Sequence, residues 1–109
     1  MLCITTTIVM AQMAPVTVFE SVKEGHKSYR IPAIVALKNG TLLAFAEGRV
    51  NNAGDFGDIN IVMKRSVDKG KTWSPVKILV NYASLQAGNP APVVDLLDPE
   101  YPQGVVYLF

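Results

Sequence analysis

The sequence predicts an all-β protein, and two observations carry that prediction. Between residues 30 and 80, apolar residues recur at every second position or in short β-branched runs, which is typical of strands. Gly, Pro and Asn interrupt these runs at regular intervals, and no stretch has the apolar spacing of an amphipathic helix. We therefore expect short antiparallel strands joined by turns.

Four strands are expected in that region: RIPAIVAL (residues 30–37), TLLAFAEG (41–48), INIVMKRS (59–66) and WSPVKILV (73–80). The first two flank Asn39-Gly40, and Asn-Gly is the strongest short signal for a hairpin. A polar loop over residues 48–58 joins the second strand to the third. Pro75 in the fourth strand indicates an edge position, because proline cannot donate a hydrogen bond to a neighbouring strand.

Four sequential strands in about 50 residues match one blade of a β-propeller. Two further runs, NPAPVVDLL (residues 89–97) and GVVYLF (104–109), look like the first two strands of a next blade. A closed propeller needs about four to eight blades, and the chain stops inside an apolar run at Phe109. We therefore expect a truncated chain that holds the first one to two blades. The alternative is a small β-sandwich, which uses about seven strands and fits six less well.

Composition excludes several classes of function. The chain has 109 residues, half of them hydrophobic, which is enough for one small domain. A net charge of +1 argues against nucleic acid and against a polybasic contact with a membrane. One Cys and one His leave no cluster at zinc-ligand spacing and no internal disulfide, so we expect neither metal nor cofactor. His26, between Gly25 and Lys27, is expected to be a solvated loop residue.

The first fifteen residues, MLCITTTIVMAQMAP, are apolar and small. They are too short to span a membrane, and they lack the basic start of a secretory signal. A signal remnant, a fragment edge and a first strand all remain open for residues 1–15. The β-rich domain is expected over residues 16–109.

Counting strands places the polar residues on two opposite faces. If the first strand runs away from one face, the 48–58 loop returns to that face after the second strand. Arg30, the loop and Asn89 then share one face, whereas the turn around Asp68 lies on the other. This placement depends on all of the strand predictions.

The stretch SVDKGKTW fits the pattern Ser-x-Asp-x-Gly-x-Thr-Trp through Ser66, Asp68, Gly70, Thr72 and Trp73. Asp68 can accept hydrogen bonds from backbone N–H groups of a tight turn, Gly70 can adopt a positive φ, and Trp73 supplies apolar area against the sheet. The pattern matches the Asp-box, or BNR repeat. We interpret these five residues as structural.

The stretch YRIPAI (residues 29–34) resembles the Arg-Ile-Pro motif of sialidases. Together with the Asp-box and with AFAEGR and GDFGDINIVMKRS, the likeness covers about residues 16–109, and the sequence is similar to exo-α-sialidases (neuraminidases) of the bacterial and animal, non-viral type. The resemblance implies a six-bladed propeller catalytic domain. It also implies retaining hydrolysis of terminal α-linked sialic acids on glycoproteins, glycolipids or oligosaccharides, with no metal. It favours a secreted, periplasmic or cell-surface location.

The resemblance assigns three substrate contacts. Arg30 matches the first arginine of the triad that binds the sialic acid carboxylate, and a guanidinium suits this because it binds carboxylates bidentately and stays charged. Arg49 matches the arginine near the 4-position of the sugar. Asn89 aligns with a polar substrate contact.

Asp55, in the 48–58 loop, stands where the family has its acid/base aspartate, which would protonate the leaving oxygen and then activate water. Asp58 is its competitor, with loop support by hydrogen bonds to backbone as its other role, and Glu47 is interpreted as structural. The family's Tyr nucleophile, its Glu partner and the other triad arginines have no match in these residues. A non-catalytic Asp-box propeller that binds glycans or proteins, and a trans-sialidase, are the alternatives.

Overall fold

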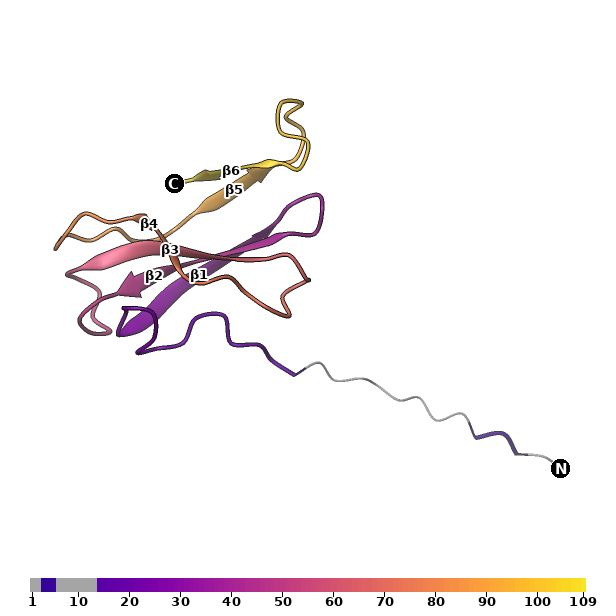
Figure 1. Ribbon diagram of the computed structural model, residues 1–109, viewed down its shortest axis with the longest axis horizontal. Helices are drawn as coiled ribbons and strands as arrows, with labels where there is room; N and C mark the ends of the chain where they lie inside the picture. The colour runs from indigo at the N-terminus through magenta and orange to yellow at the C-terminus, as the bar shows by residue number, and fades with distance from the viewer. Residues whose placement is uncertain (1–2, 6–13) are drawn as a thin grey trace.

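A computed structural model describes residues 3–5 and 14–109 of the chain. The protein is all-β, as the sequence predicts, with a four-stranded and a two-stranded antiparallel sheet (Figure 1). The strands are β1 (Ser28–Ala36), β2 (Leu42–Arg49), β3 (Ile59–Ser66), β4 (Lys77–Val80), β5 (Pro92–Asp95) and β6 (Val105–Leu108). The predictions for residues 1–15 concern mainly residues 1–2 and 6–13, which lie outside the described residues.

The first sheet is a meander in the order β1-β2-β3-β4. The strand β4 lies at the edge, as Pro75 predicts, but it begins at Lys77 rather than Trp73. Ser74 still exchanges hydrogen bonds with the backbone of Arg65, through its own N–H group (2.8 Å) and its Oγ (2.9 Å). The chain therefore leaves the Asp-box beside β3 and becomes a regular strand only after the proline.

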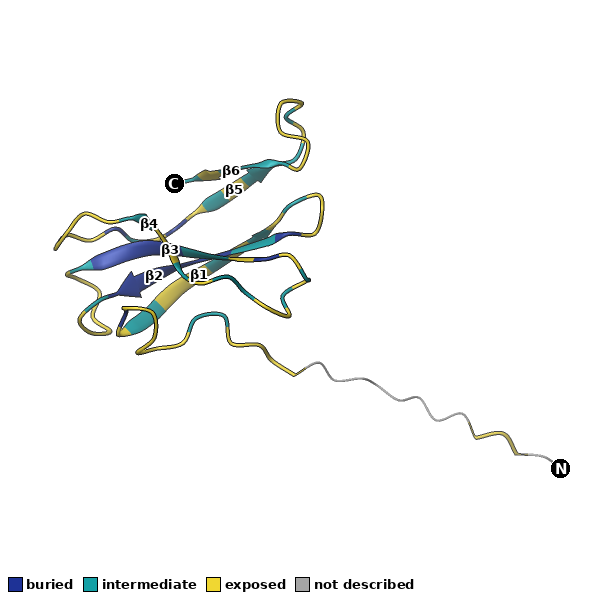
Figure 2. Ribbon diagram, in the orientation of Figure 1, coloured by how far each residue is buried: buried dark blue, intermediate teal, exposed yellow. Residues whose placement is uncertain are grey.

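Most of the core lies on the two central strands, β2 and β3, each of which has a neighbouring strand on both edges (Figure 2). Its buried apolar residues are Ala44, Phe45, Ala46, Ile59, Ile61 and Val62 on these strands, together with Ala87 from the segment between β4 and β5. In contrast, β1 is mostly exposed, and Ile34 keeps 59% of its surface in solvent. The sheet is therefore well buried at its centre and open along β1.

A bulge interrupts β1 directly after Arg30. The register with β2 shifts between Arg30 and Ala33, and Ile31 has a φ of +52°, which is rare for a β-branched residue. Upstream of the bulge, Arg30 pairs with Glu47 and Ser28 pairs with Arg49. Because side chains alternate between faces, these four residues point to the same side of the sheet.

The second sheet is the hairpin β5–β6, and Ala91 and Phe109 extend its ladder by two hydrogen bonds of 3.0 and 3.2 Å. The backbone N–H of Lys38 donates to the carbonyl of Gln103 (3.1 Å), which joins the β1–β2 turn to the β5–β6 turn. The two sheets are consistent with part of a sialidase propeller. Within the described residues, no helix is long and apolar enough to cross a membrane.

Candidate active site

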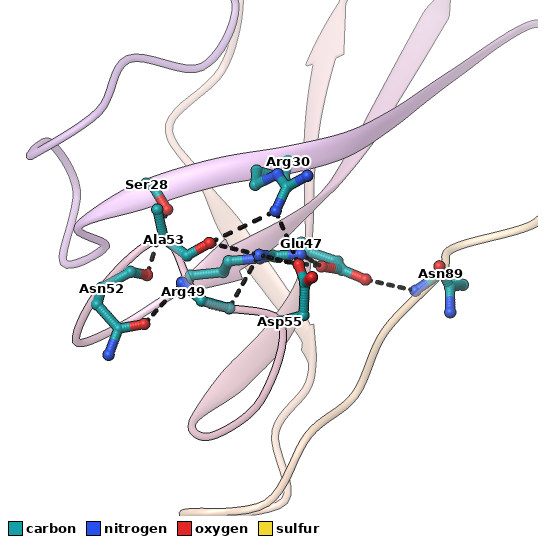
Figure 3. Close-up of polar contacts among 9 residues, drawn as sticks. Ser28, Arg30, Glu47, Arg49, Asn52, Ala53, Asp55 and Asn89 are labelled. Carbon is teal, nitrogen blue, oxygen red and sulfur yellow. Dashed lines mark hydrogen bonds and ion pairs between the residues drawn. The ribbon is translucent and has the colours of Figure 1, made fainter.

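The polar residues that the strand count places at the same end of the strands do come together. Arg30 from β1, Glu47 and Arg49 from β2, and Asp55 from the loop after β2 form one cluster, and Asn89 lies beside it (Figure 3). This loop lies at one end of the sheet, and the Asp-box turn lies at the other end (Figure 1). The antiparallel meander and the segment that follows it therefore bring Arg30 and Asn89, which are 59 positions apart, to one end of the sheet.

A buried ion pair forms the base of the cluster. Glu47 and Arg49 are 2% and 3% exposed, and Oε2 of Glu47 accepts from Nη2 (2.6 Å) and Nε (3.1 Å) of Arg49. The other carboxylate oxygen, Oε1, accepts from the backbone N–H of Asn89 (2.8 Å). At Gly88 a Cβ atom would come within 2.8 Å of that oxygen, so glycine allows the chain to pass close to Glu47. Glu47 is therefore structural, and it fixes both Arg49 and the segment that carries Asn89.

Arg49 also holds the loop after β2. Its Nη1 donates to the carbonyl oxygens of Ala53 (2.7 Å) and Gly54 (2.8 Å) and to Oδ1 of Asp55 (2.8 Å). All three guanidinium nitrogens thus have partners within the protein. A direct contact of Arg49 with a ligand would require movement of residues 53–55.

Asp55 lies between the two arginines. Its Oδ1 accepts from Nη1 of Arg49 and from Nη1 of Arg30 (2.7 Å), while 68% of its side chain remains exposed. The hydrogen bond from Arg49, and then the charges of Arg30 and Arg49, hold the pKa of Asp55 below its usual value. In this arrangement Asp55 is an exposed carboxylate that accepts hydrogen bonds from both arginines.

Asp58 has a different environment. Its backbone carbonyl accepts from the N–H of Val50 (3.1 Å) and closes the base of the loop. Its Oδ1 is buried, and no described residue donates a hydrogen bond to it. The loop is therefore supported by the backbone of Asp58, and not by the carboxylate that the sequence suggested.

The cluster contains no set of metal ligands. Nowhere in residues 3–5 and 14–109 do three or more His, Cys, Asp or Glu side chains gather around a point that could hold an ion. Asn89, with a φ of +55°, is exposed and takes part through its backbone. The charged groups of the cluster are the guanidinium groups of Arg30 and Arg49 and the carboxylates of Glu47 and Asp55. Of these four charged side chains, only Arg30 and Asp55 are exposed to solvent.

Comparison with known proteins identifies the family. No family model matches the chain. Over 91 residues, or 78% of this chain, it is 42% identical to an exo-α-sialidase of Aspergillus fumigatus. It is 35% identical over 80 residues to a sialidase of Micromonospora viridifaciens and 48% identical over 48 residues, 44% of this chain, to one of Clostridium perfringens. The chain is homologous to a segment of the sialidases. Through that segment it belongs to the sialidase family.

The match covers 21% of the Aspergillus sialidase and 11% of the Micromonospora sialidase. The chain thus spans about a fifth or less of the length of these curated relatives. The sialidase resemblance drawn from the Arg-Ile-Pro motif and the Asp-box is confirmed at the level of the family. The roles of individual residues remain predictions.

The Asp-box of this sialidase homologue forms the tight turn that its residues predict. Oδ1 of Asp68 accepts from the Ser66 hydroxyl (2.8 Å) and from the Thr72 N–H (2.9 Å). Gly70 has a φ of +84° and donates its N–H to the Ser66 Oγ (2.8 Å), and the Trp73 indole donates to the Gly70 carbonyl (3.1 Å). The turn is self-contained and lies at the end of the sheet opposite the arginine cluster.

The prediction that His26 is solvated is wrong. His26 is 4% exposed, and its ring packs against Gly48, where a Cβ atom would come within 2.5 Å of the imidazole. The polar neighbours of His26 in the sequence gave no sign of this burial, which arises because the chain before β1 folds over the sheet. The glycine between Glu47 and Arg49 is the one signal that could have indicated a close approach.

Proposed function

We propose that the protein is an exo-α-sialidase, a glycoside hydrolase that releases terminal α-linked sialic acids from glycoconjugates, and that residues 16–109 supply the first one to two blades of its six-bladed propeller. The observation that carries this proposal is the convergence of Arg30 and Arg49 on the exposed carboxylate of Asp55. A carboxylate-binding arginine beside a solvent-accessible acid suits a substrate that carries its own carboxylate next to the scissile bond. Homology to sialidases supports the same substrate class.

In this mechanism Arg30 binds the sialic acid carboxylate and Asp55 protonates the leaving glycosidic oxygen. A tyrosine outside these residues attacks the anomeric carbon, and the glycosidic bond breaks as the tyrosyl bond forms. Sialidases are a known exception to the two-carboxylate scheme of glycosidases in using a tyrosine. Asp55 then takes a proton from water, which displaces the tyrosine with overall retention. Asn89 contacts the sugar. No metal or other cofactor takes part.

The low pKa of Asp55 has to rise before it can act as an acid. Of the two arginines, Arg30 is the one that a substrate can bind in place of Asp55, because 47% of its side chain is exposed to solvent. When the substrate carboxylate binds Arg30, Asp55 loses one cation and gains a neighbouring anion, and both changes raise its pKa. Substrate binding therefore prepares the acid.

Substitution of Asp55 tests the proposal in the full-length protein. Asp55→Ala should lower kcat by about 100-fold or more on sialosides with a sugar leaving group, and by much less on activated aryl sialosides that need no protonation. Asp58→Ala is the matched control, since it removes from the same loop a carboxylate whose buried Oδ1 accepts no hydrogen bond from any described residue. Equal losses on both substrates would refute the acid role.

A non-catalytic glycan-binding propeller is the second candidate, and the low pKa of Asp55 is the observation that favours it. Such a protein would bind a sialoside through Arg30 and show no hydrolysis. Calorimetric binding of a sialyl-oligosaccharide without turnover, with binding lost in Arg30→Ala, would support this candidate over the hydrolase.

A trans-sialidase would instead transfer sialic acid to an added galactoside. In either case we propose that the protein acts outside the cytoplasm, where sialylated glycans are displayed.

A further inference from the structure

His26 lies on the face of the sheet opposite to the candidate active site. It precedes β1, and its ring covers one row of paired residues from the first three strands, which are Tyr29, Gly48 and Asn60. Glu47 and Arg49, on either side of Gly48 in the chain, point to the other face because side chains in a strand alternate. The imidazole therefore lies behind the segment that carries the buried ion pair.

Hydrogen bonds fix both nitrogens of the ring. Nδ1 is 3.0 Å from the carbonyl oxygen of Glu24, which can only accept, so Nδ1 carries the proton. The Tyr29 hydroxyl donates to the Lys23 carbonyl (2.8 Å), which leaves its oxygen to accept from the same Nδ1 (3.3 Å). Nε2 is then an acceptor for Nδ2 of Asn60 (3.2 Å). These contacts hold the ring in one orientation and one tautomer.

The segment before β1 is built to hold this ring. Three of its residues, Val22, Glu24 and Gly25, have φ values of +66°, +53° and +83°, and left-handed backbone at the two non-glycine positions persists only where the surroundings enforce it. The Glu24 carboxylate pairs with Lys64 of β3 (2.6 Å) and accepts from the N–H of Val76 (2.9 Å). The segment is thus anchored through Glu24, two residues before His26.

The same segment is bonded directly to Arg49. The backbone N–H of Lys27 donates to the carbonyl of Arg49 (2.8 Å). Lys27 follows His26 and Arg49 follows Gly48, so this bond lies directly beside the contact between the ring and Gly48. We propose that His26 is a positioning residue, which sets the backbone at Gly48 and Arg49 from behind the sheet and, through the Arg49 guanidinium, fixes the carboxylate of Asp55. The inference rests on the proposed function only where it concerns catalysis; the coupling between His26 and Asp55 is a property of the fold.

The coupling can be measured by NMR titration of the full-length protein labelled with ¹³C-aspartate. Asp55→Asn identifies the Asp55 carboxyl signal by its loss. His26→Ala opens a void behind Gly48, Arg49 loosens, and the pKa of Asp55 rises toward the ordinary value for aspartate. Adding Gly48→Ala to that variant fills part of the void with a methyl group and brings the titration back toward that of the wild-type protein.

Ser66→Ala is the matched control for loss of stability. Ser66 is 1% exposed and makes two hydrogen bonds, but it lies in the Asp-box at the other end of β3. We expect this variant to lower the melting temperature without moving the Asp55 titration. If His26→Ala leaves that titration unchanged, or if Ser66→Ala moves it equally, the positioning role is refuted. His26→Gln, which keeps a donor and an acceptor, takes the place of His26→Ala if the latter does not fold.

Kinetics separate this inference from the proposed function. His26→Ala should lower kcat on a sialoside with a sugar leaving group by about tenfold with little change in KM, because Arg30 still binds the substrate carboxylate. If Asp55→Ala shows that Asp55 is not the acid while His26→Ala still shifts the Asp55 titration, the proposed function fails and the positioning role stands. If Asp55 is the acid and the titration does not move, only the positioning role fails.

Discussion

The two arginines of the cluster have opposite environments. Arg49 is buried and saturated by Glu47, Asp55 and two backbone carbonyls, whereas nearly half of the Arg30 side chain is in solvent. Burial makes a charge costly to leave unpaired, and exposure makes a pair weak. The two residues should therefore differ in what they contribute to folding and to ligand binding.

Substitution of each arginine tests this difference. Arg49→Ala leaves the Glu47 carboxylate buried without its cation, and the free energy of unfolding should fall by about 3–5 kcal/mol. Arg30→Ala breaks an exposed pair and should cost less than about 1 kcal/mol. Denaturant unfolding of the two variants measures both values. Equal losses would show that the arginine cluster is not divided into a buried and an exposed member.

Asp68 gives a pH dependence of stability. The Thr72 hydroxyl and N–H group are the main causes that lower its pKa from 3.8 to about 2. A depressed pKa stabilises the folded state above pH 3.8, and this contribution is lost as the pH falls from 3.8 to about 2. Asp68→Asn cannot titrate, so its unfolding free energy should fall less steeply over that interval than the wild-type value. Parallel pH profiles would contradict this assignment.

The motifs around Arg30, Arg49 and Asp55 and the strand count identified these residues from the sequence. The sequence could not predict which hydrogen bonds and ion pairs they form. The burial of Glu47 and Arg49 depends on a register that pairs them with β1 and β3. His26 was misjudged for a related reason, because local polarity says nothing about a segment that folds over a sheet. Both facts become visible only when three strands are assembled.

At the scale of elements, the Asp-box turn shows how backbone conformation limits sequence. Lys69 and Gly70 are consecutive left-handed residues, with φ values of +62° and +84°. A side chain in this region costs about 1–2 kcal/mol, and glycine avoids that cost. The turn therefore contains one residue that suits its conformation and one that does not.

Two substitutions in this turn should have opposite signs. Gly70→Ala should lower the free energy of unfolding by about 1 kcal/mol or more. Lys69→Gly should raise it by a smaller amount, because the added freedom of the unfolded glycine offsets part of the relief. Thermal denaturation of both variants provides the measurement. A stabilised Gly70→Ala protein would mean that the turn changes conformation on substitution.

The strands themselves were predictable, and their irregularities were not. Alternating apolar residues and Asn39-Gly40 identified β1 and β2 to within two residues at each end. The bulge at Ile31 is not predicted by the apolar run, and Pro32 beside it, a residue that strands tolerate at bulges and edges, was interpreted only as part of a motif. The late start of β4 reflects the fold of the preceding turn, which a strand pattern does not include.

At the scale of the whole molecule, the two sheets leave much apolar surface in solvent. Ile34, Val93, Leu97 and Phe109 are each more than half exposed. An open sheet with few strands rarely buries enough area to be stable by itself. The six-bladed propeller of the proposed function would cover such faces with neighbouring blades.

The 109-residue chain tested alone should not hydrolyse a fluorogenic sialoside. The proposed mechanism requires a tyrosine nucleophile, and none of the tyrosines at positions 29, 82, 101 and 107 matches that role in the sialidase resemblance. Tyr29 is committed to Lys23 and His26 on the far side of the sheet. Measured turnover by the isolated chain, above that of an Asp55→Ala control, would overturn the placement of the nucleophile outside these residues.

The ion pair between the Asp55 carboxylate and Arg30 affects how activity should be assayed. Acetate and citrate, the usual buffers at mildly acidic pH, are themselves carboxylates and can compete for the same guanidinium. Their occupancy would rise with concentration, and added salt would weaken the exposed Arg30–Asp55 contact at the same time. Apparent substrate affinity would then depend on the identity of the buffer as well as on pH. Rates measured in acetate and in a cationic buffer such as bis-tris would differ at the same pH and ionic strength.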